Sequence, residues 1–228
     1  WLDSGSKTPF FIWIHYNDPH VPYKPPVPYN KLYVRDKFYN PDKKVNLVDN
    51  IYGWGGISPK ANIEDIRELD YYIAQYDGEI RYTDFWIGRL MDYLKAKGFY
   101  DDSVIVISAD HGEAFGEHNL YCEHANTLYD ELIRVPLIIR FPGAAFKDKR
   151  VKRQVRSIDL MPTILNYSNL KIPQHLDGES LLPLLRLQGE YAARFSFSKT
   201  GLMAALRTEE WKLIYYEGEE GGVINYTI

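Results

Sequence analysis

The sequence has very little cysteine, no long hydrophobic run and no excess of positive charge. Cys122 is the single cysteine in 228 residues, so the chain cannot form an internal disulfide. This usage fits a reducing compartment, although secreted proteins can also lack disulfides. No run approaches the roughly 18 apolar residues of a membrane-spanning helix, and no signal peptide is visible. The compartment stays open, with a periplasmic or secreted location allowed, because the chain starts at Trp1 rather than Met.

The charge balance and the absence of several motifs argue against further classes of protein. Lys and Arg number 27 and Asp and Glu 31, a net charge of −4, which argues against a generally basic nucleic-acid-binding protein. No G-x-S-x-G elbow, Walker A loop or G-x-G-x-x-G fingerprint is present, and one cysteine cannot form a C-x-x-C zinc site. The chain is instead rich in hydrophobic (45%) and aromatic (15%) residues. A chain of this size can bury about 70% of its unfolded surface, so a core is expected.

The pattern of apolar residues predicts an α/β fold. Runs of aromatic and β-branched residues at 10–16, 103–109 and 135–141 are typical of buried strands. Residues 63–97 carry apolar side chains at spacings of three and four, which predicts one long helix that stops before Gly98. A coiled coil is the alternative for this segment, but the flanking strands favour α/β packing.

The last quarter of the chain has a different pattern. Short helices are expected at 157–165 and 179–185, and strands at 191–199, 201–207 and 211–217. We therefore predict an α/β domain over residues 1–185 and the start of a small antiparallel β-rich subdomain over residues 186–228. The irregular connection upstream, residues 29–60, is interpreted as a lid or substrate-facing loop. The Tyr-rich segment 23–54 is a candidate for stacking on sugar rings or aryl groups, with a packed surface loop as the alternative.

Histidines and carboxylates concentrate just after the predicted strand 103–109. Asp110 and His111 come first, followed by Gly112 and Glu113. Small molecules and ions that bind open α/β proteins do so beyond the carboxyl ends of the strands. A carboxylate and an imidazole at such a place can together coordinate a divalent metal. The alternative is an N-capping Asp beside a surface His.

Other histidines offer weaker signals. His20 lies between Pro19 and Pro22, which stiffen its backbone and suit a histidine that must point at a substrate oxygen; a His packed in a loop is the alternative. His118 and His124 flank aromatic segments and can bind an anion or simply lie on the surface. Cys122 is a poor candidate nucleophile, because adjacency to His124 in sequence is not spatial pairing.

Several stretches, in the right order, resemble the sulfatase family of the alkaline-phosphatase-like superfamily. They are PHVPY, YDGEIRYTDFWIGRLMDYL, VIVISADHGEAFGEHNLY, LYDELIRVPLIIRFPG, SIDLMPTIL, HLDGESLLPLL and ALRTEEWKLIY. The resemblance implies a mixed, largely parallel sheet flanked by helices, with a small antiparallel C-terminal sheet. It implies metal-dependent hydrolysis of sulfate esters, with Asp110 and His111 as metal ligands and His20 and His124 against the anionic group. The role implied for His118, beside the site, stays open.

The sequence departs from the family pattern in one respect. Family enzymes carry a nucleophile in a C-x-P-x-R or S-x-P-x-R motif and two more acidic metal ligands in an N-terminal portion, and no such motif occurs in this sequence. We therefore expect the C-terminal part of a sulfatase-like hydrolase, inactive alone, with weak metal binding. A part of a larger sheet is also expected to expose an apolar edge or face.

The resemblance leaves metal, substrate and activity partly open. Calcium is the first candidate metal, and manganese or zinc would suit a phosphoesterase. The substrate is expected to be a small anionic ester such as a sulfated sugar or an aryl sulfate. A phosphoester or phosphonate monoester hydrolase on the same scaffold is one alternative, and a non-catalytic relative that binds anionic glycans is another.

Overall fold

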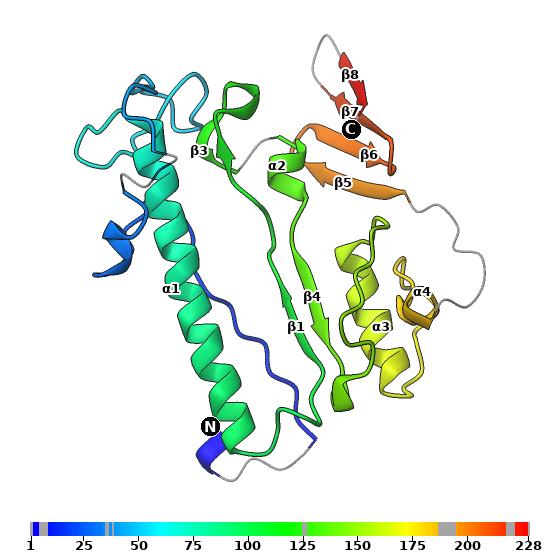
Figure 1. Cartoon of the computed structure of the whole chain (residues 1–228). Helices are drawn as coiled ribbons and strands as arrows, with labels where there is room; N and C mark the ends of the chain where they lie inside the picture. Colours follow the sequence, from blue (N-terminus) through cyan, green and yellow to red (C-terminus); the bar gives the residue numbers. More distant parts are fainter. Residues whose placement is uncertain are drawn as a thin grey trace. The chain divides into compact units, whose positions relative to one another are not determined.

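The computed structural model describes residues 2–4, 9–34, 37, 39–124, 127–186, 195–217 and 222–227. The chain forms two compact units, one of Trp1–Leu90 with Asn119–Cys122 and one of Met91–His118 with Glu123–Ile228. The elements in chain order (Figure 1) are η1 (Leu2–Ser4), η2 (Tyr29–Lys31), α1 (Leu69–Ala96), β1 (Ile105–Ser108), β2 (Ala114–Phe115), η3 (Glu117–Asn119), β3 (Tyr121–Glu123), α2 (Asp130–Ile133), β4 (Leu137–Arg140), η4 (Pro142–Ala144), η5 (Ser157–Asp159), α3 (Leu160–Tyr167), α4 (Leu182–Arg186), β5 (Ser196–Thr200), β6 (Met203–Arg207), β7 (Trp211–Tyr216) and β8 (Gly222–Thr227). None of the helices described is long and apolar enough to cross a bilayer.

The long predicted helix is present as α1, but it begins later than predicted. Residues 63–68 are not helical, because Asn62 forms a local turn: its Oδ1 accepts a hydrogen bond from the backbone N–H of Asp65 at 3.0 Å. Such side-chain bonds to nearby backbone compete with helix formation. The end agrees with the prediction, since Gly98 adopts a positive φ of 75° and its N–H bonds to the carbonyl of Lys95.

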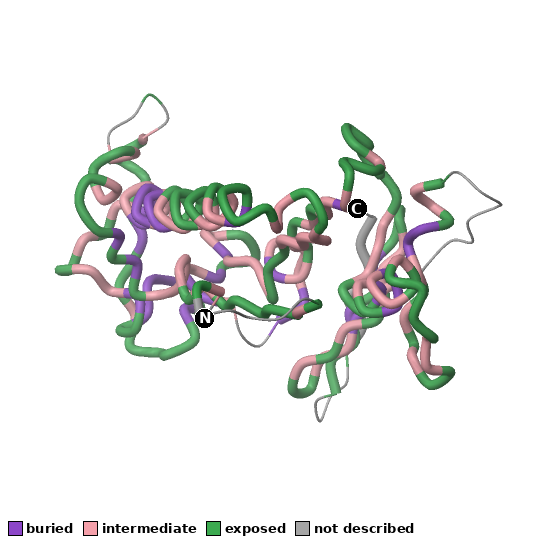
Figure 2. The backbone as a smooth tube through the Cα atoms, turned by 90° about the horizontal axis from the view of Figure 1, so that it is seen from below, coloured by how far each residue is buried: buried purple, intermediate pink, exposed green. Residues whose placement is uncertain are grey.

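The buried face of α1 differs from the predicted apolar stripe. Tyr72, Gln75 and Glu79 are buried, whereas Ile80, which the stripe included, is 43% exposed. Figure 2 shows the buried residues gathered in the first half of the helix. At Gly78 a Cβ would lie 2.9 Å from Cγ of Pro25, so the Pro-rich segment comes close to the helix backbone. A glycine inside α1 is thus explained by this close approach.

The predicted buried strand at residues 10–16 is wrong. The segment is extended but joins no strand ladder in the described part of the chain, and Phe11 and Trp13 are 76% and 79% exposed. An apolar run forms a buried strand only when partner strands and a covering layer are available. The exposure of these side chains agrees with the expected apolar edge or face.

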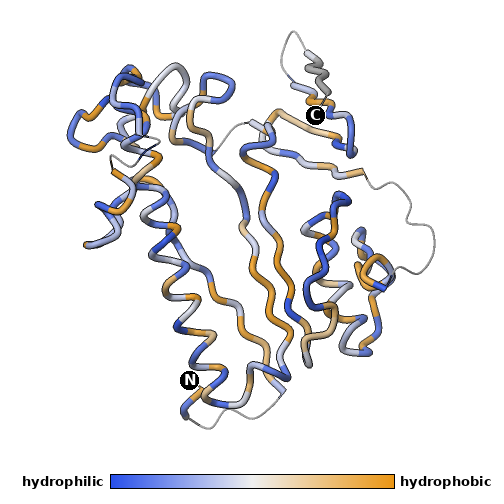
Figure 3. Tube along the Cα trace, viewed as in Figure 1, coloured by the Kyte–Doolittle hydropathy of each residue, from blue (hydrophilic) through white to orange (hydrophobic). Residues whose placement is uncertain are grey.

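The strands predicted at 103–109 and 135–141 are present as β1 and β4, but the prediction that they are buried is wrong, since every residue of both strands is half-buried or exposed. They pair antiparallel, with Ile105 opposite Arg140 and Ser108 opposite Leu137. Figure 3 shows that both strands are strongly apolar. Ile138 on β4 is 60% exposed, so one face of this pair also carries apolar side chains in solvent.

The C-terminal region forms a four-stranded antiparallel sheet with the order β5-β6-β7-β8. The strands predicted at 201–207 and 211–217 correspond to β6 and β7, whereas β8 was not predicted. Of the strand predicted at 191–199, residues 191–194 lie outside the described residues, and β5 begins at Ser196. Leu128 packs with Ala205 and Ile214 of this sheet in a small core.

The two helices predicted near residues 160 and 180 are also present, as η5 with α3 and as α4. Asp159 is fully buried between them. Its Oδ1 accepts hydrogen bonds from Arg156 and from the backbone N–H of Glu179, both at 2.9 Å. Burial raises the pKa of Asp159, but these hydrogen bonds outweigh it and hold the pKa below its usual value. A buried carboxylate thus joins α3 to the segment before α4.

Candidate functional site

Asp110 and His111 follow β1 after one intervening residue, close to where the sequence predicts them. Nδ1 of His111 lies 2.8 Å from the carbonyl oxygen of Gly112. A carbonyl can only accept, so Nδ1 carries the proton and Nε2 carries the lone pair of the neutral ring. Oδ2 of Asp110 lies 3.9 Å from this Nε2. A histidine that ligates a metal commonly donates its other ring N–H to a backbone carbonyl in this way.

The turn that carries these two residues is held by α2. The N–H of Gly112 donates to the carbonyl of Leu132 at 2.7 Å. A Cβ at Gly112 would lie 2.0 Å from the backbone oxygen of Glu131, a distance that no side chain tolerates. Glycine is therefore required here for the close approach of two backbones.

His124 joins the same group of residues. Its ring stacks on that of His111, with centroids 4.0 Å apart and planes 15° from parallel. Nδ1 of His124 lies 3.2 Å from Oε1 of Glu113, whose side chain is nearly buried. The structure thus brings Asp110, His111 and His124 together within the second unit.

His118 lies in the same unit but has different partners. Its Nδ1 is 2.8 Å from Oε1 of Glu131, and its ring stacks on Tyr129 with centroids 3.5 Å apart. The residue has a positive φ of 53°. These contacts hold the loop before β3 against α2.

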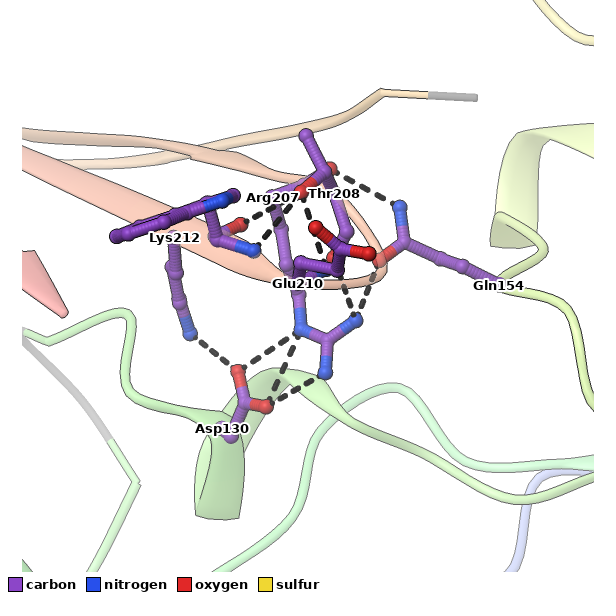
Figure 4. A network of polar contacts seen from close by, with 7 residues as sticks. Asp130, Gln154, Arg207, Thr208, Glu210 and Lys212 are labelled. Atoms are coloured by element: carbon purple, nitrogen blue, oxygen red, sulfur yellow. Dashed lines mark hydrogen bonds and ion pairs between the residues drawn. The ribbon is translucent and has the colours of Figure 1, made fainter. Parts of the chain in front are cut away.

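Asp130 anchors α2 to the C-terminal sheet. Its carboxylate accepts hydrogen bonds from Nη2 of Arg207 at 2.9 Å and from Nζ of Lys212 at 2.6 Å (Figure 4). The Lys212 side chain is 0% exposed. Burial raises the pKa of Asp130, but the two cations outweigh it and lower the pKa. Gln154 completes the network by bonding the guanidinium and the backbone carbonyl of Arg207.

His20 belongs to the first unit, where Glu79 of α1 holds its loop. The backbone N–H of His20 donates to Oε2 of Glu79 at 3.1 Å, and the N–H of Lys24 donates to Oε1 at 2.6 Å. Nδ1 of His20 lies 2.7 Å from the carbonyl of Val21, so this nitrogen carries the proton. Burial raises the pKa of Glu79 to about 7, with Asp18 adding to the rise and the two N–H donors opposing it.

Sequence reasoning missed the three glutamates that hold these histidines. Glu79 lies three residues after Tyr76 and four before Thr83, both on the predicted apolar stripe, so its position on that face was the available signal. Glu113 adjoins the D-H-G triplet, although nothing in the sequence relates it to His124. The pairing of Glu131 with His118 has no signal in the sequence, because it depends on the path of the loop between them.

The donor set fits part of a metal site. Asp110 offers oxygen and His111 nitrogen, and their 3.9 Å separation lets one cation contact both, since two coordination bonds of about 2.1–2.4 Å reach that far. Among the residues that the structure describes, however, no group of three or more His, Cys, Asp or Glu side chains is arranged to hold an ion. The pair supplies two ligands, fewer than the four of zinc or the six to eight of calcium.

The chain is similar in sequence to known proteins. The chain is 31% identical over 205 residues to the multifunctional alkaline phosphatase superfamily protein PehA of Trinickia caryophylli, covering 81% of this chain and 39% of that protein. It is 30% identical over 180 residues to the N-acetylglucosamine-6-O-sulfatase of Bacteroides thetaiotaomicron, covering 72% of this chain and 31% of that protein. The chain therefore spans less than half the length of these relatives.

A solved structure is also similar to this chain and is likewise matched over only part of its length. The phosphonate monoester hydrolase of Silicibacter pomeroyi matches 92% of this chain and 48% of its own, with 27% identity and a TM-score of 0.71. The family model described as Sulfatase matches residues 1–170, which include Asp110, His111, His124 and His20. The chain belongs to the sulfatase family, within the alkaline-phosphatase-like superfamily.

Proposed function

We propose that this chain carries the metal- and anion-binding part of a hydrolase of sulfate esters. Asp110 and His111 would hold a divalent cation, and His124 and His20 would contact the anionic ester. The observation that carries the proposal is the stack of His111 on His124 beside Asp110, because the two proposed metal ligands then lie against a second imidazole.

Each residue has a defined task in this proposal. A bound divalent cation supplies Lewis-acid polarisation of the ester oxygens. Glu113 orients His124 through Nδ1, so that Nε2 is the ring atom directed at the anion. His20, with Nδ1 donating to Val21, likewise presents Nε2 to an ester or leaving-group oxygen. Fixed groups of this kind stabilise charge that develops on the ester during hydrolysis.

We further propose that the 228-residue chain is inactive alone and binds metal weakly. Two ligands leave half or more of a calcium, manganese or zinc coordination shell to water, and no C-x-P-x-R or S-x-P-x-R nucleophile motif occurs in the sequence. Calcium is the first candidate for the metal.

The substrate of the proposed enzyme is a small anionic ester. The relative that is an N-acetylglucosamine-6-O-sulfatase supports a sulfated sugar. The second candidate function is hydrolysis of phosphonate monoesters, which the similarity to the phosphonate monoester hydrolase of known structure supports.

Binding of an aryl sulfate tests the proposal. We expect 4-nitrophenyl sulfate to bind the chain in the presence of Ca²⁺, to bind about tenfold more weakly to His124→Ala, and to be unaffected by His175→Ala at an exposed position. Binding without metal, or equal binding by both variants, would overturn the assignment. A phenyl phosphonate monoester that binds much more tightly than the sulfate would favour the second function.

Turnover is measured in the same samples. No release of 4-nitrophenol is expected from the chain alone. Robust release with the sulfate ester would refute the proposal that this chain lacks the nucleophile.

A further inference from the structure

Glu79 is a buried carboxyl whose two oxygens are both used on one short loop. It is 3% exposed and lies on α1, within the face that packs in the first unit. Its oxygens accept the backbone N–H groups of His20 and Lys24, at the two ends of a five-residue turn. A side chain that only filled space on this face would not need a carboxylate, which is costly to bury.

We propose that Glu79 is a positioning residue for His20: by holding both ends of the turn from His20 to Lys24, it sets the direction of the His20 imidazole. This inference rests on the proposed function, in which His20 contacts the anionic ester.

The remaining contacts of the turn support a positioning role. The carbonyl of Val21 fixes Nδ1 of His20, so once the backbone is held the ring has one preferred orientation. The residues just before the turn are also tied to α1, where Oγ1 of Thr83 donates to the carbonyl of Asp18 at 3.1 Å. Residues 18 to 24 are thus attached to one helix at three points.

The charge of Glu79 governs how firmly the turn is held. Hydrogen bonds to an ionised carboxylate are shorter and stronger than those to a neutral acid. The groups that act on this carboxyl are Asp18, whose charge opposes ionisation, and the N–H donors of His20 and Lys24, which favour it. Since burial brings the pKa to about 7, the turn is held more firmly above neutral pH than below it.

NMR of the 228-residue chain tests this without any need for turnover. The backbone amide signal of Lys24 should shift with pH with a midpoint near 7 in the wild type, because its acceptor gains a charge there. In Glu79→Gln the shift should disappear. The matched control is Asp84→Asn, an exposed carboxyl on the same helix that pairs with Arg81; it should behave as wild type. A Lys24 amide that does not titrate, or titrates equally in Glu79→Gln, would overturn the inference.

The ring of His20 provides a second readout. Its ¹⁵N shifts should report a proton on Nδ1 in the wild type at pH 8 and a mixture of tautomers in Glu79→Gln. An unchanged tautomer in a folded Glu79→Gln protein would reduce Glu79 to a structural residue. Glu79→Asp, which keeps the charge on a shorter side chain, should restore part of the Nδ1–H population.

Ligand binding separates this inference from the proposed function. With Ca²⁺ present, Glu79→Gln and His20→Ala should each weaken 4-nitrophenyl sulfate binding by about tenfold, whereas Asp84→Asn should not. If His20→Ala weakens binding and Glu79→Gln does not, the positioning role is wrong and the function stands. If the wild-type chain binds no aryl sulfate, the function fails while the NMR result on the turn still decides whether Glu79 holds His20.

Discussion

The imidazole of His124 lies against that of His111, with ring centroids 4.0 Å apart and planes 15° from parallel. One ring belongs to the proposed metal pair and the other to the proposed anion contact. The stack therefore couples the two parts of the site, because movement of either ring removes the packing surface of the other.

Replacing His124 should weaken metal binding although His124 is not a proposed ligand. His124→Ala removes the stack and should lower the affinity for Ca²⁺ or Mn²⁺ several-fold, measured by isothermal titration calorimetry. His124→Phe keeps a flat ring and should restore metal affinity but not aryl sulfate binding. Equal metal affinities in the Ala and Phe variants would show that the stack does not support His111.

The two proposed ligands should be the main determinants of metal affinity. Asp110→Asn and His111→Ala should each abolish the weak binding of the chain, since neither remaining ligand holds an ion alone. Asp102→Asn, an exposed carboxyl before β1, is the matched control and should bind metal as wild type does. A wild-type affinity in His111→Ala would place the metal elsewhere.

The network around Asp130 should contribute strongly to stability. Asp130→Ala removes the carboxylate that contacts the fully buried Lys212 and should lower the free energy of unfolding by about 3 kcal/mol, measured by urea denaturation at pH 7. Lys212→Met should cost less, because Arg207 still pairs with Asp130. Arg81→Ala, which breaks an exposed pair, should cost under about 1 kcal/mol.

The lowered pKa of Asp130 predicts that the protein loses stability in acid. The pKa of Asp130 is lower in the folded than in the unfolded state, so its contribution is complete above the usual Asp value of 3.8 and is lost as the pH falls below it. Wild type should lose more stability between pH 5 and pH 3 than Asp130→Asn does. Identical losses would contradict the assignment.

Two glycines should respond to alanine in opposite ways. Gly112→Ala places a Cβ 2.0 Å from the backbone oxygen of Glu131, so it should destabilise the protein and weaken metal binding at the neighbouring His111. Gly88 lies inside α1 with nothing within 4 Å of the position that a Cβ would take, and Gly88→Ala should raise stability by about 1 kcal/mol. Thermal unfolding of both variants checks these two predictions. A stable Gly112→Ala protein with normal metal affinity would contradict the close approach of Gly112 to the backbone of Glu131.

Glu79 should make the protein less stable as the pH rises towards neutrality. Its pKa is about 7 in the folded state against 4.5 for an ordinary glutamate. Between these two pH values the folded state therefore binds more protons than the unfolded state does. The free energy of unfolding should fall by up to about 1.4 kcal/mol per pH unit between these values. Urea unfolding at pH 5 and pH 7.5 should show a smaller fall in Glu79→Gln than in wild type, and an equal fall would count against a buried, ionising Glu79.

Local sequence predicted most elements well where the signal was continuous. The β-branched runs at 103–109 and 135–141 contain β1 and β4, and the spacing of three and four predicted α1 and its end shortly before Gly98. The D-H-G triplet stands after the carboxyl end of β1, where the sequence places it, and its role as a metal site stays a prediction. The domain division at residue 185 stays a prediction.

Prediction failed where a residue's environment comes from distant parts of the chain. The run at 10–16 has the composition of a buried strand, yet Phe11 and Trp13 are exposed because a strand needs partners that composition does not specify. Ile80 is exposed and Glu79 buried for a similar reason: the packed face of α1 depends on the Pro-rich segment that lies against it.

The amino-acid sequence was enough to indicate the family, the α/β class and the candidate residues Asp110, His111, His124 and His20, because ordered motifs and hydrophobic periodicity are local properties. The folded structure was needed to show that His124 stacks on His111, that Glu79 holds the His20 turn and that Asp130 pairs with Arg207. These contacts join residues that lie 13, 59 and 77 positions apart. Such pairs meet only after the chain has folded, and the burial and charges that then surround them shift the pKa of Glu79 upwards and that of Asp130 downwards.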